Sequence, residues 1–100
     1  MVKSDAAGEL AAAAEILKEN PESFIILAGF TDDVGDEEYN LGLSLRRVEA
    51  VRDHLMKEHM IDESRIILFW YGEAAPIADN ATAAGRQMNR RVSGLIGGVD

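Results

Sequence analysis

Hydrophobic residues in the first third of the chain follow two different patterns. Residues 5–19 carry apolar side chains at the spacing of one helical face, and an Asn-Pro pair ends the pattern; these side chains are Leu10, Ala13, Ala14 and Leu17. Residues 24–30, FIILAGF, form a continuous apolar run that is rich in strand formers. Because this run is too short for a helix of its own, we expect a helix followed by a buried strand.

A second helix and a second apolar run follow. Apolar residues step at helical intervals across residues 37–59, and residues 65–71, RIILFWY, again have strand composition. Two buried strands joined by a helix of this length form a βαβ unit with parallel strands. We therefore expect an α/β fold in two layers, with helices on one face of a sheet. These two strands are its predicted central pair, and Trp70 lies in the predicted core.

The last third of the sequence predicts a loop, a short helix and a final strand. The helix occupies residues 82–89, with Thr82 as a plausible N-cap, and the strand occupies residues 90–96. Arg90 and Arg91 begin this strand and point to opposite faces, where we expect structural salt bridges. The chain has no internal repeat and no linker, so we expect a single domain over residues 1–100.

Composition and charge restrict the classes of partner. No stretch approaches the roughly 20 apolar residues that span a bilayer, so we expect no membrane insertion by this domain. The net charge is −8 and the pI is about 4.6, which would repel a phosphate backbone and disfavours nucleic acid. The chain contains no cysteine, which removes disulfides, thiol nucleophiles and thiolate metal sites.

Nothing in the sequence supports catalysis or a metal centre. His54 and His59 are five residues apart on the predicted helix, about 140° around its axis, which argues against a shared metal. The serines do not lie in a G-x-S-x-G setting, the acidic loop fails the EF-hand pattern, and no phosphate-binding glycine motif is present. We therefore expect a protein that is not an enzyme and needs no cofactor.

The densest polar segment, TDDVGDEE, lies between the first predicted strand and the long helix. Ligands of open α/β sheets bind at such carboxyl ends of parallel strands, although acidic residues there also serve as helix caps. One narrow stripe of the long helix carries Asn40, Leu43, Ser44 and Arg47. Asp32 and Arg47 can thus face a common cleft that suits a zwitterion. The alternatives from the residues alone are a loop cap at Asp32 and a plain salt bridge between the two.

Two segments resemble a known family signature. TDDVGDEEYNLGLSLRRVEAV and YGEAAPIADNATAAGRQMNRRV are similar to the OmpA-like domain, the peptidoglycan-associated module that OmpA, Pal and the flagellar stator protein MotB share. The resemblance covers about residues 10–92 and leaves residues 93–100 as a divergent tail. It implies the OmpA-like fold, and a periplasmic domain that tethers a bacterial envelope protein to the cell wall.

The resemblance also implies a ligand and its contacts. In that family a loop aspartate and a helix arginine hold the zwitterionic end of diaminopimelate, in the peptide stem of peptidoglycan. By this likeness Asp32 takes the ligand ammonium and Arg47 the carboxylate, with Thr31, Asn40 and Leu43 beside them. Peptidoglycan is therefore the expected partner.

The chain departs from the family pattern in ways that leave a second function open. Family members normally begin with a strand that is missing here, so we expect an open sheet edge that allows a homo-oligomer. Trp70 stands where the family usually has glycine. The alternative function is a structural or assembly domain of the same fold, which has lost the ligand and acts by protein contacts.

Overall fold

The computed structural model describes residues 4–74 and 78–99. Its elements, in chain order, are α1 (Ser4–Glu19), β1 (Phe24–Phe30), α2 (Glu37–His59), a 3-10 turn (Glu63–Arg65), β2 (Ile66–Gly72), α3 (Ala83–Asn89) and β3 (Val92–Gly97). The predicted limits of β1 and α2 are confirmed, as is Thr82, whose hydroxyl accepts the Gly85 N–H at 2.9 Å as the N-cap of α3. Strand β3 begins later than predicted because Arg90 still caps α3.

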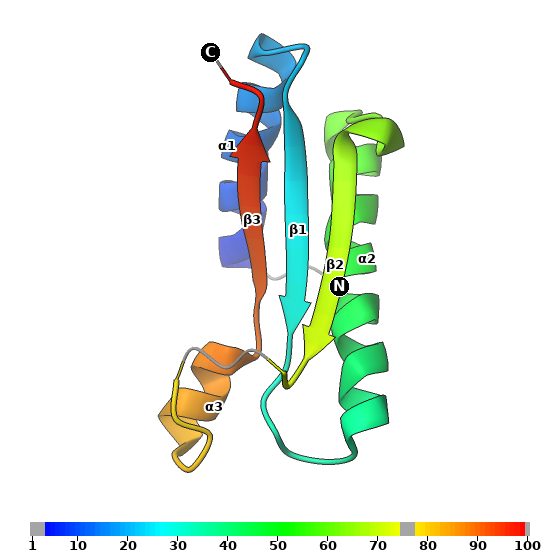
Figure 1. The fold of residues 1–100 in the computed structure, drawn as a ribbon. Helices are drawn as coiled ribbons and strands as arrows, with labels where there is room; N and C mark the ends of the chain where they lie inside the picture. The colour runs from blue at the N-terminus through cyan, green and yellow to red at the C-terminus, as the bar shows by residue number, and fades with distance from the viewer. Residues whose placement is uncertain (1–3, 75–77, 100) are drawn as a thin grey trace.

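The three strands form one mixed sheet in the order β2-β1-β3. Strand β1 pairs with β2 in parallel orientation, which confirms the βαβ unit, and with β3 in antiparallel orientation, which places β3 at an edge of the described sheet. Helices α1 and α2 lie behind this sheet in Figure 1, so the two-layer α/β fold is confirmed. The predicted central pair is wrong in one respect: β1 alone is central, because β3 returns to its other side and leaves β2 at an edge.

The core lies between the sheet and its two long helices. Strand register aligns Ile25 with Ile66, and both side chains are buried on the face toward the helices. Leu17 of α1 and Val48 and Leu55 of α2 meet them in one buried cluster. Burying side chains of this size contributes about 1.5–3 kcal/mol each, so this cluster holds the helices on the sheet.

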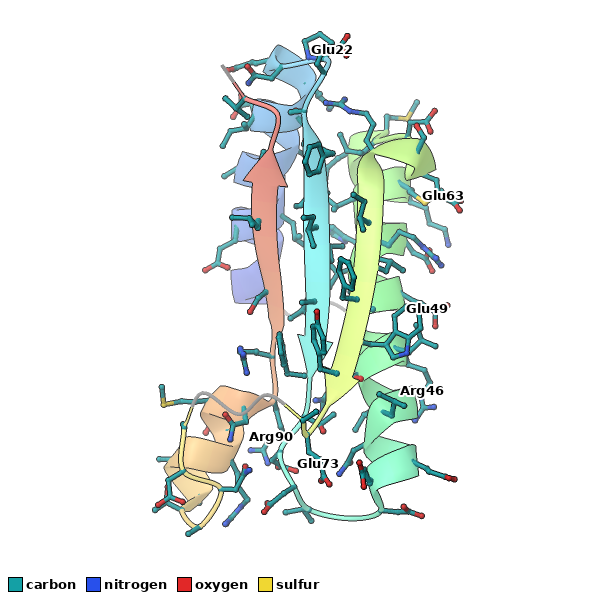
Figure 2. The ribbon with its side chains drawn as sticks, in the orientation of Figure 1. Glu22, Arg46, Glu49, Glu63, Glu73 and Arg90 are labelled. Atoms are coloured by element: carbon teal, nitrogen blue, oxygen red, sulfur yellow. The ribbon has the colours of Figure 1, made fainter. Side chains whose placement is uncertain are left out.

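The opposite face of the sheet carries apolar side chains that no described helix covers. Ile67, Phe69 and Tyr71 of β2 are exposed on this face, which is turned toward the viewer in Figure 2. The prediction that β2 is a buried strand is therefore wrong. The core assignment of Trp70 is also wrong, since this residue is 41% exposed. The physical reason is the place of β2: an edge strand of a sheet covered on one face buries few of its side chains.

Arg65 joins the end of α1 to the start of β1. Its guanidinium donates hydrogen bonds to the carbonyl oxygens of Leu17, Asn20 and Ser23, the last two at 2.9 and 3.0 Å. These carbonyls belong to the last turn of a helix and to the following connection, where backbone acceptors lack helical partners. Arg65 thus adds a charged donor to these carbonyls: that of Leu17 has no helical N–H partner because position 21 is proline, whereas that of Asn20 also accepts the N–H of Ser23.

We expect Arg65→Met to lower the free energy of unfolding by about 2 kcal/mol, because part-buried carbonyls lose a charged donor. Urea unfolding followed by circular dichroism measures this change. Lys57→Met removes the same charge from an exposed position on α2 and should change stability by less than about 0.5 kcal/mol. Equal effects of the two substitutions would contradict the role given to Arg65.

The described sheet has two outer edges, along β2 and β3. Unpaired edge N–H and C=O groups recruit further strands, so we expect the domain to self-associate at high concentration through a two-fold contact. Its negative charge opposes this approach, and association should strengthen as salt rises. Sedimentation at several concentrations and two ionic strengths measures it; a strict monomer throughout would contradict the prediction.

None of the helices within the described ranges is long and apolar enough to cross a bilayer.

Candidate functional site

The chain leaves β1 through two buried polar residues, Thr31 and Asp32. The N–H of Thr31 donates to the carbonyl oxygen of Gly72 at 2.8 Å, which ties the start of the loop to the end of β2. The Thr31 hydroxyl donates to the carbonyl oxygen of Asp32 at 2.9 Å. Gly72 has a φ of 58°, a left-handed conformation that suits glycine. The loop therefore starts from a fixed point at the carboxyl ends of both parallel strands.

Both carboxylate oxygens of Asp32 are engaged. Oδ1 accepts the N–H of Val34 at 3.0 Å, which closes a local turn, and Oδ2 accepts Nη1 of Arg90 at 2.6 Å. Burial of a carboxylate is costly unless a cation or hydrogen-bond donors compensate for the lost water. Asp32 is therefore a fixed anion at the end of the sheet, and Arg90 is its counter-ion.

Asn40, in the first turn of α2, holds the loop from the other side. Its buried side-chain Nδ2 lies 3.0 Å from the carbonyl oxygen of Val34, 3.4 Å from that of Asp32 and 3.3 Å from Oε2 of Glu73. Helix α2 starts at this point because Asp36 acts as its N-cap and accepts the N–H of Glu38. Asn40 thus connects the helix to the loops that follow β1 and β2.

Arg47 lies two turns further along α2 and faces the end of β1. Its Nη1 donates to the carbonyl oxygen of Phe30 at 3.2 Å. Burial lowers the pKa of the Arg47 guanidinium from its ordinary value, and repulsion from Arg90 lowers it further, while Asp32 acts in the opposite direction. The guanidinium therefore lies in the electric fields of both partners of the ion pair. Asp32 pairs with Arg90 rather than with Arg47, so the plain Asp32–Arg47 salt bridge is not formed.

Leu43 and Arg47 line a cavity of about 870 Å³. It lies between α1, α2 and β3, and Arg46, Gln87, Arg90 and Arg91 also contribute to its wall. Apolar side chains supply much of the rest: Leu10, Ile25, Leu27, Val51, Val92 and Ile96. Arg90 therefore pairs with the Asp32 carboxylate and also lines this cavity.

Two residues of the site, Arg90 and Glu73, were not predicted from the sequence to belong to it. Figure 2 shows both at the end of the sheet where the loops gather, while Arg46 lies on α2. A salt bridge of Arg90 was expected, but its partner was not identified. Glu73 belongs to the Tyr-Gly-Glu element that begins the second family-like segment, and this element is the sequence feature that could have indicated it. Arg91 forms no ion pair with a described residue; its guanidinium instead covers the ring of Phe30, 3.7 Å from the ring centre.

The described part of the chain contains no cluster of three or more His, Asp or Glu residues able to hold a metal ion. What the site offers chemically is one buried carboxylate, Asp32, next to two guanidinium groups, Arg47 and Arg90. The nearby carboxylate of Glu73 is held by Asn40. Such an arrangement is chemically suited to a small group that carries both charges, and these residues include no nucleophile paired with a base.

Comparison with known proteins gives consistent matches. The model of the OmpA family matches residues 2–90. The chain is 43% identical to outer membrane porin F of Pseudomonas aeruginosa, over 95% of this chain and 27% of the porin. It is 37% identical to the peptidoglycan-binding protein ArfA of Mycobacterium bovis, over 83% of this chain and 25% of that protein. The crystal structure of the peptidoglycan-associated lipoprotein from Burkholderia pseudomallei has a TM-score of 0.89 and 30% identity, covering 96% of this chain and 80% of that one.

Proposed function

Because the chain belongs to the OmpA family, we propose that this domain binds peptidoglycan without catalysis, through the diaminopimelate of the peptide stem. The names of the ArfA and Burkholderia relatives support peptidoglycan as the partner. The main support for diaminopimelate as the ligand is the buried Asp32 carboxylate, which lies at the carboxyl end of β1 with two arginines near it. One end of diaminopimelate is an ammonium and a carboxylate on one carbon, and this set of charges complements it.

In the proposed complex, Asp32 accepts hydrogen bonds from the ligand ammonium and Arg47 pairs with the carboxylate. The planar fork of arginine binds a carboxylate with two parallel hydrogen bonds, which a lysine does not reproduce. Thr31 and Asn40 support binding by holding the loop in place. Leu43 lines the cavity beside Arg47 and offers an apolar contact for the ligand's methylene chain.

We also propose that the domain is periplasmic and anchors a larger envelope protein to the cell wall. The chain spans about a quarter of the length of the curated relatives described above, 27% and 25%. The outer-membrane location in the porin's name supports an envelope parent. Residues 1–100 would then act as one wall-binding domain of that protein.

A second candidate is a structural or assembly domain of the same fold that works by protein contacts. Exposed apolar side chains on the open sheet face favour it, namely Ile67, Phe69, Tyr71 and Leu95. The two candidates predict different results with a small ligand. An assembly domain binds a protein surface and should be indifferent to diaminopimelate.

Calorimetric titration with a stem tripeptide that contains diaminopimelate tests the proposal. The matched control peptide carries lysine at the same position and lacks only the terminal carboxylate. We expect binding of the diaminopimelate peptide and much weaker binding of the lysine peptide, since Arg47 then loses its partner. Absence of binding heat for both peptides would contradict the proposal and favour the assembly role.

A further inference from the structure

In the domain without a ligand, Asp32 forms an ion pair with Arg90, and a further property of the site follows from this pair. Arg90 Nη1 lies 2.6 Å from Asp32 Oδ2. The side chain of Asp32 is only 8% exposed, whereas that of Arg90 is 43% exposed. The anion is thus fixed in the protein, while its counter-ion stands at the surface with water on one side.

Both oxygens of Asp32 already accept a hydrogen bond, Oδ1 from the backbone N–H of Val34 and Oδ2 from Nη1 of Arg90. Each oxygen can accept a second hydrogen bond, but the Val34 N–H belongs to the backbone of the loop, so of these two donors only the Arg90 side chain can move aside for a ligand ammonium. Glu73 accepts a hydrogen bond from Asn40 Nδ2 at 3.3 Å and, among the described residues, forms no ion pair with Arg90, which pairs with Asp32. An ammonium that approaches Asp32 therefore meets a cation already in place.

We propose that Arg90 is a specificity-determining residue of this site: it occupies the ammonium position in the free domain and moves aside only for a ligand that also brings a carboxylate. This inference rests on the proposed function. When the ligand is zwitterionic, its carboxylate pairs with both Arg47 and the displaced Arg90. Both arginines line the cavity between α1, α2 and β3. When the ligand has an ammonium alone, Arg90 is displaced with no anion to receive it.

The consequence is discrimination by charge repulsion as well as by attraction. Unfavourable placement of like charges is an effective way to reject a wrong ligand. In this site the repelled ligand is an alkyl ammonium such as the lysine side chain, and the accepted one is an amino acid end group. Arg90 thus raises the preference of the site for diaminopimelate over lysine.

The test is the ratio of the dissociation constants of the lysine and diaminopimelate tripeptides, measured by calorimetry for wild type and for Arg90→Gln. We expect this ratio to fall at least about tenfold in Arg90→Gln, chiefly because the lysine peptide gains affinity. Arg52→Gln is the matched control, since Arg52 pairs with Glu49 and Asp53 on α2 and does not line the cavity, and it should leave the ratio unchanged. Arg90→Lys, which keeps a cation, should retain most of the wild-type ratio.

An unchanged or larger ratio in a folded Arg90→Gln domain would overturn this inference and leave the proposed function intact. Absence of binding by the wild type would overturn the proposed function and this inference with it. If Arg90→Gln does not fold, the Arg90 side-chain N–H signal of the ¹⁵N-labelled wild type provides the measurement. Its chemical shift should move on addition of the diaminopimelate peptide, and a signal that stays in place at saturation would refute displacement.

Discussion

Gly29→Ala should lower the free energy of unfolding by about 3 kcal/mol, the upper part of the range for overpacking a core. A Cβ at position 29 would lie 2.3 Å from the backbone oxygen of Ser44 and 3.4 Å from Cβ of Val48. The obstacle is the backbone of α2, which cannot rotate away as a side chain can. The helix would have to move off the sheet, and the buried contacts of Val48 would loosen with it.

Gly94→Ala is the matched control, because this glycine also lies in a strand. A Cβ at position 94 would meet Ile25 and Leu27 at 3.7 Å, an ordinary van der Waals distance. We expect it to leave stability unchanged or to raise it by up to about 1 kcal/mol, since alanine restricts the unfolded chain. Chemical denaturation of both variants measures the difference. A Gly29→Ala domain as stable as Gly94→Ala would contradict the close packing of α2 on β1.

Asp32→Ala and Arg47→Ala should each weaken binding of the diaminopimelate tripeptide by at least about 2 kcal/mol, or about 30-fold. Each substitution removes one partner of a charge contact that is desolvated in the complex. Asp32→Asn is a gentler variant, because its oxygen still accepts the Val34 N–H, and it should lose a similar share of affinity. The titration described under Proposed function measures all three.

Arg52→Ala is the control for loss of a positive charge on the same helix. Arg52 pairs with Glu49 and Asp53 near the surface, so its removal should leave affinity close to that of wild type. Arg91→Ala should act mainly on the melting temperature, since its guanidinium packs over Phe30. Unchanged affinity in Asp32→Ala or in Arg47→Ala would refute the assignment of that residue to the ligand.

Local sequence signals were sufficient to predict the limits of β1 and α2. The apolar run of residues 24–30 is short and bounded by polar residues, and Asp36 starts α2 as a cap, so the limits of both elements depend on nearby residues. The exposure of β2 and Trp70 does not follow from such signals. A continuous apolar run has the same composition in a strand covered on two faces as in an edge strand covered on one.

The site residues also divide into those that local sequence signals predict and those that such signals do not. Thr31, Asp32 and Asn40 come together because a strand end and the next helix start are close in the chain, which the sequence pattern predicts. The pairing of Asp32 with Arg90 spans 58 residues and depends on β3 returning beside β1 in antiparallel orientation. No spacing rule predicted that return or chose between Arg47 and Arg90 as the counter-ion.

The most direct test of the central claim is sedimentation of the purified domain with insoluble peptidoglycan that contains diaminopimelate. We predict that the domain sediments with the wall material, that the stem tripeptide containing diaminopimelate releases it, and that the lysine tripeptide at the same concentration does not. A domain that stays in the supernatant, or one that the diaminopimelate tripeptide fails to release, would contradict recognition of the peptide stem through Asp32 and Arg47.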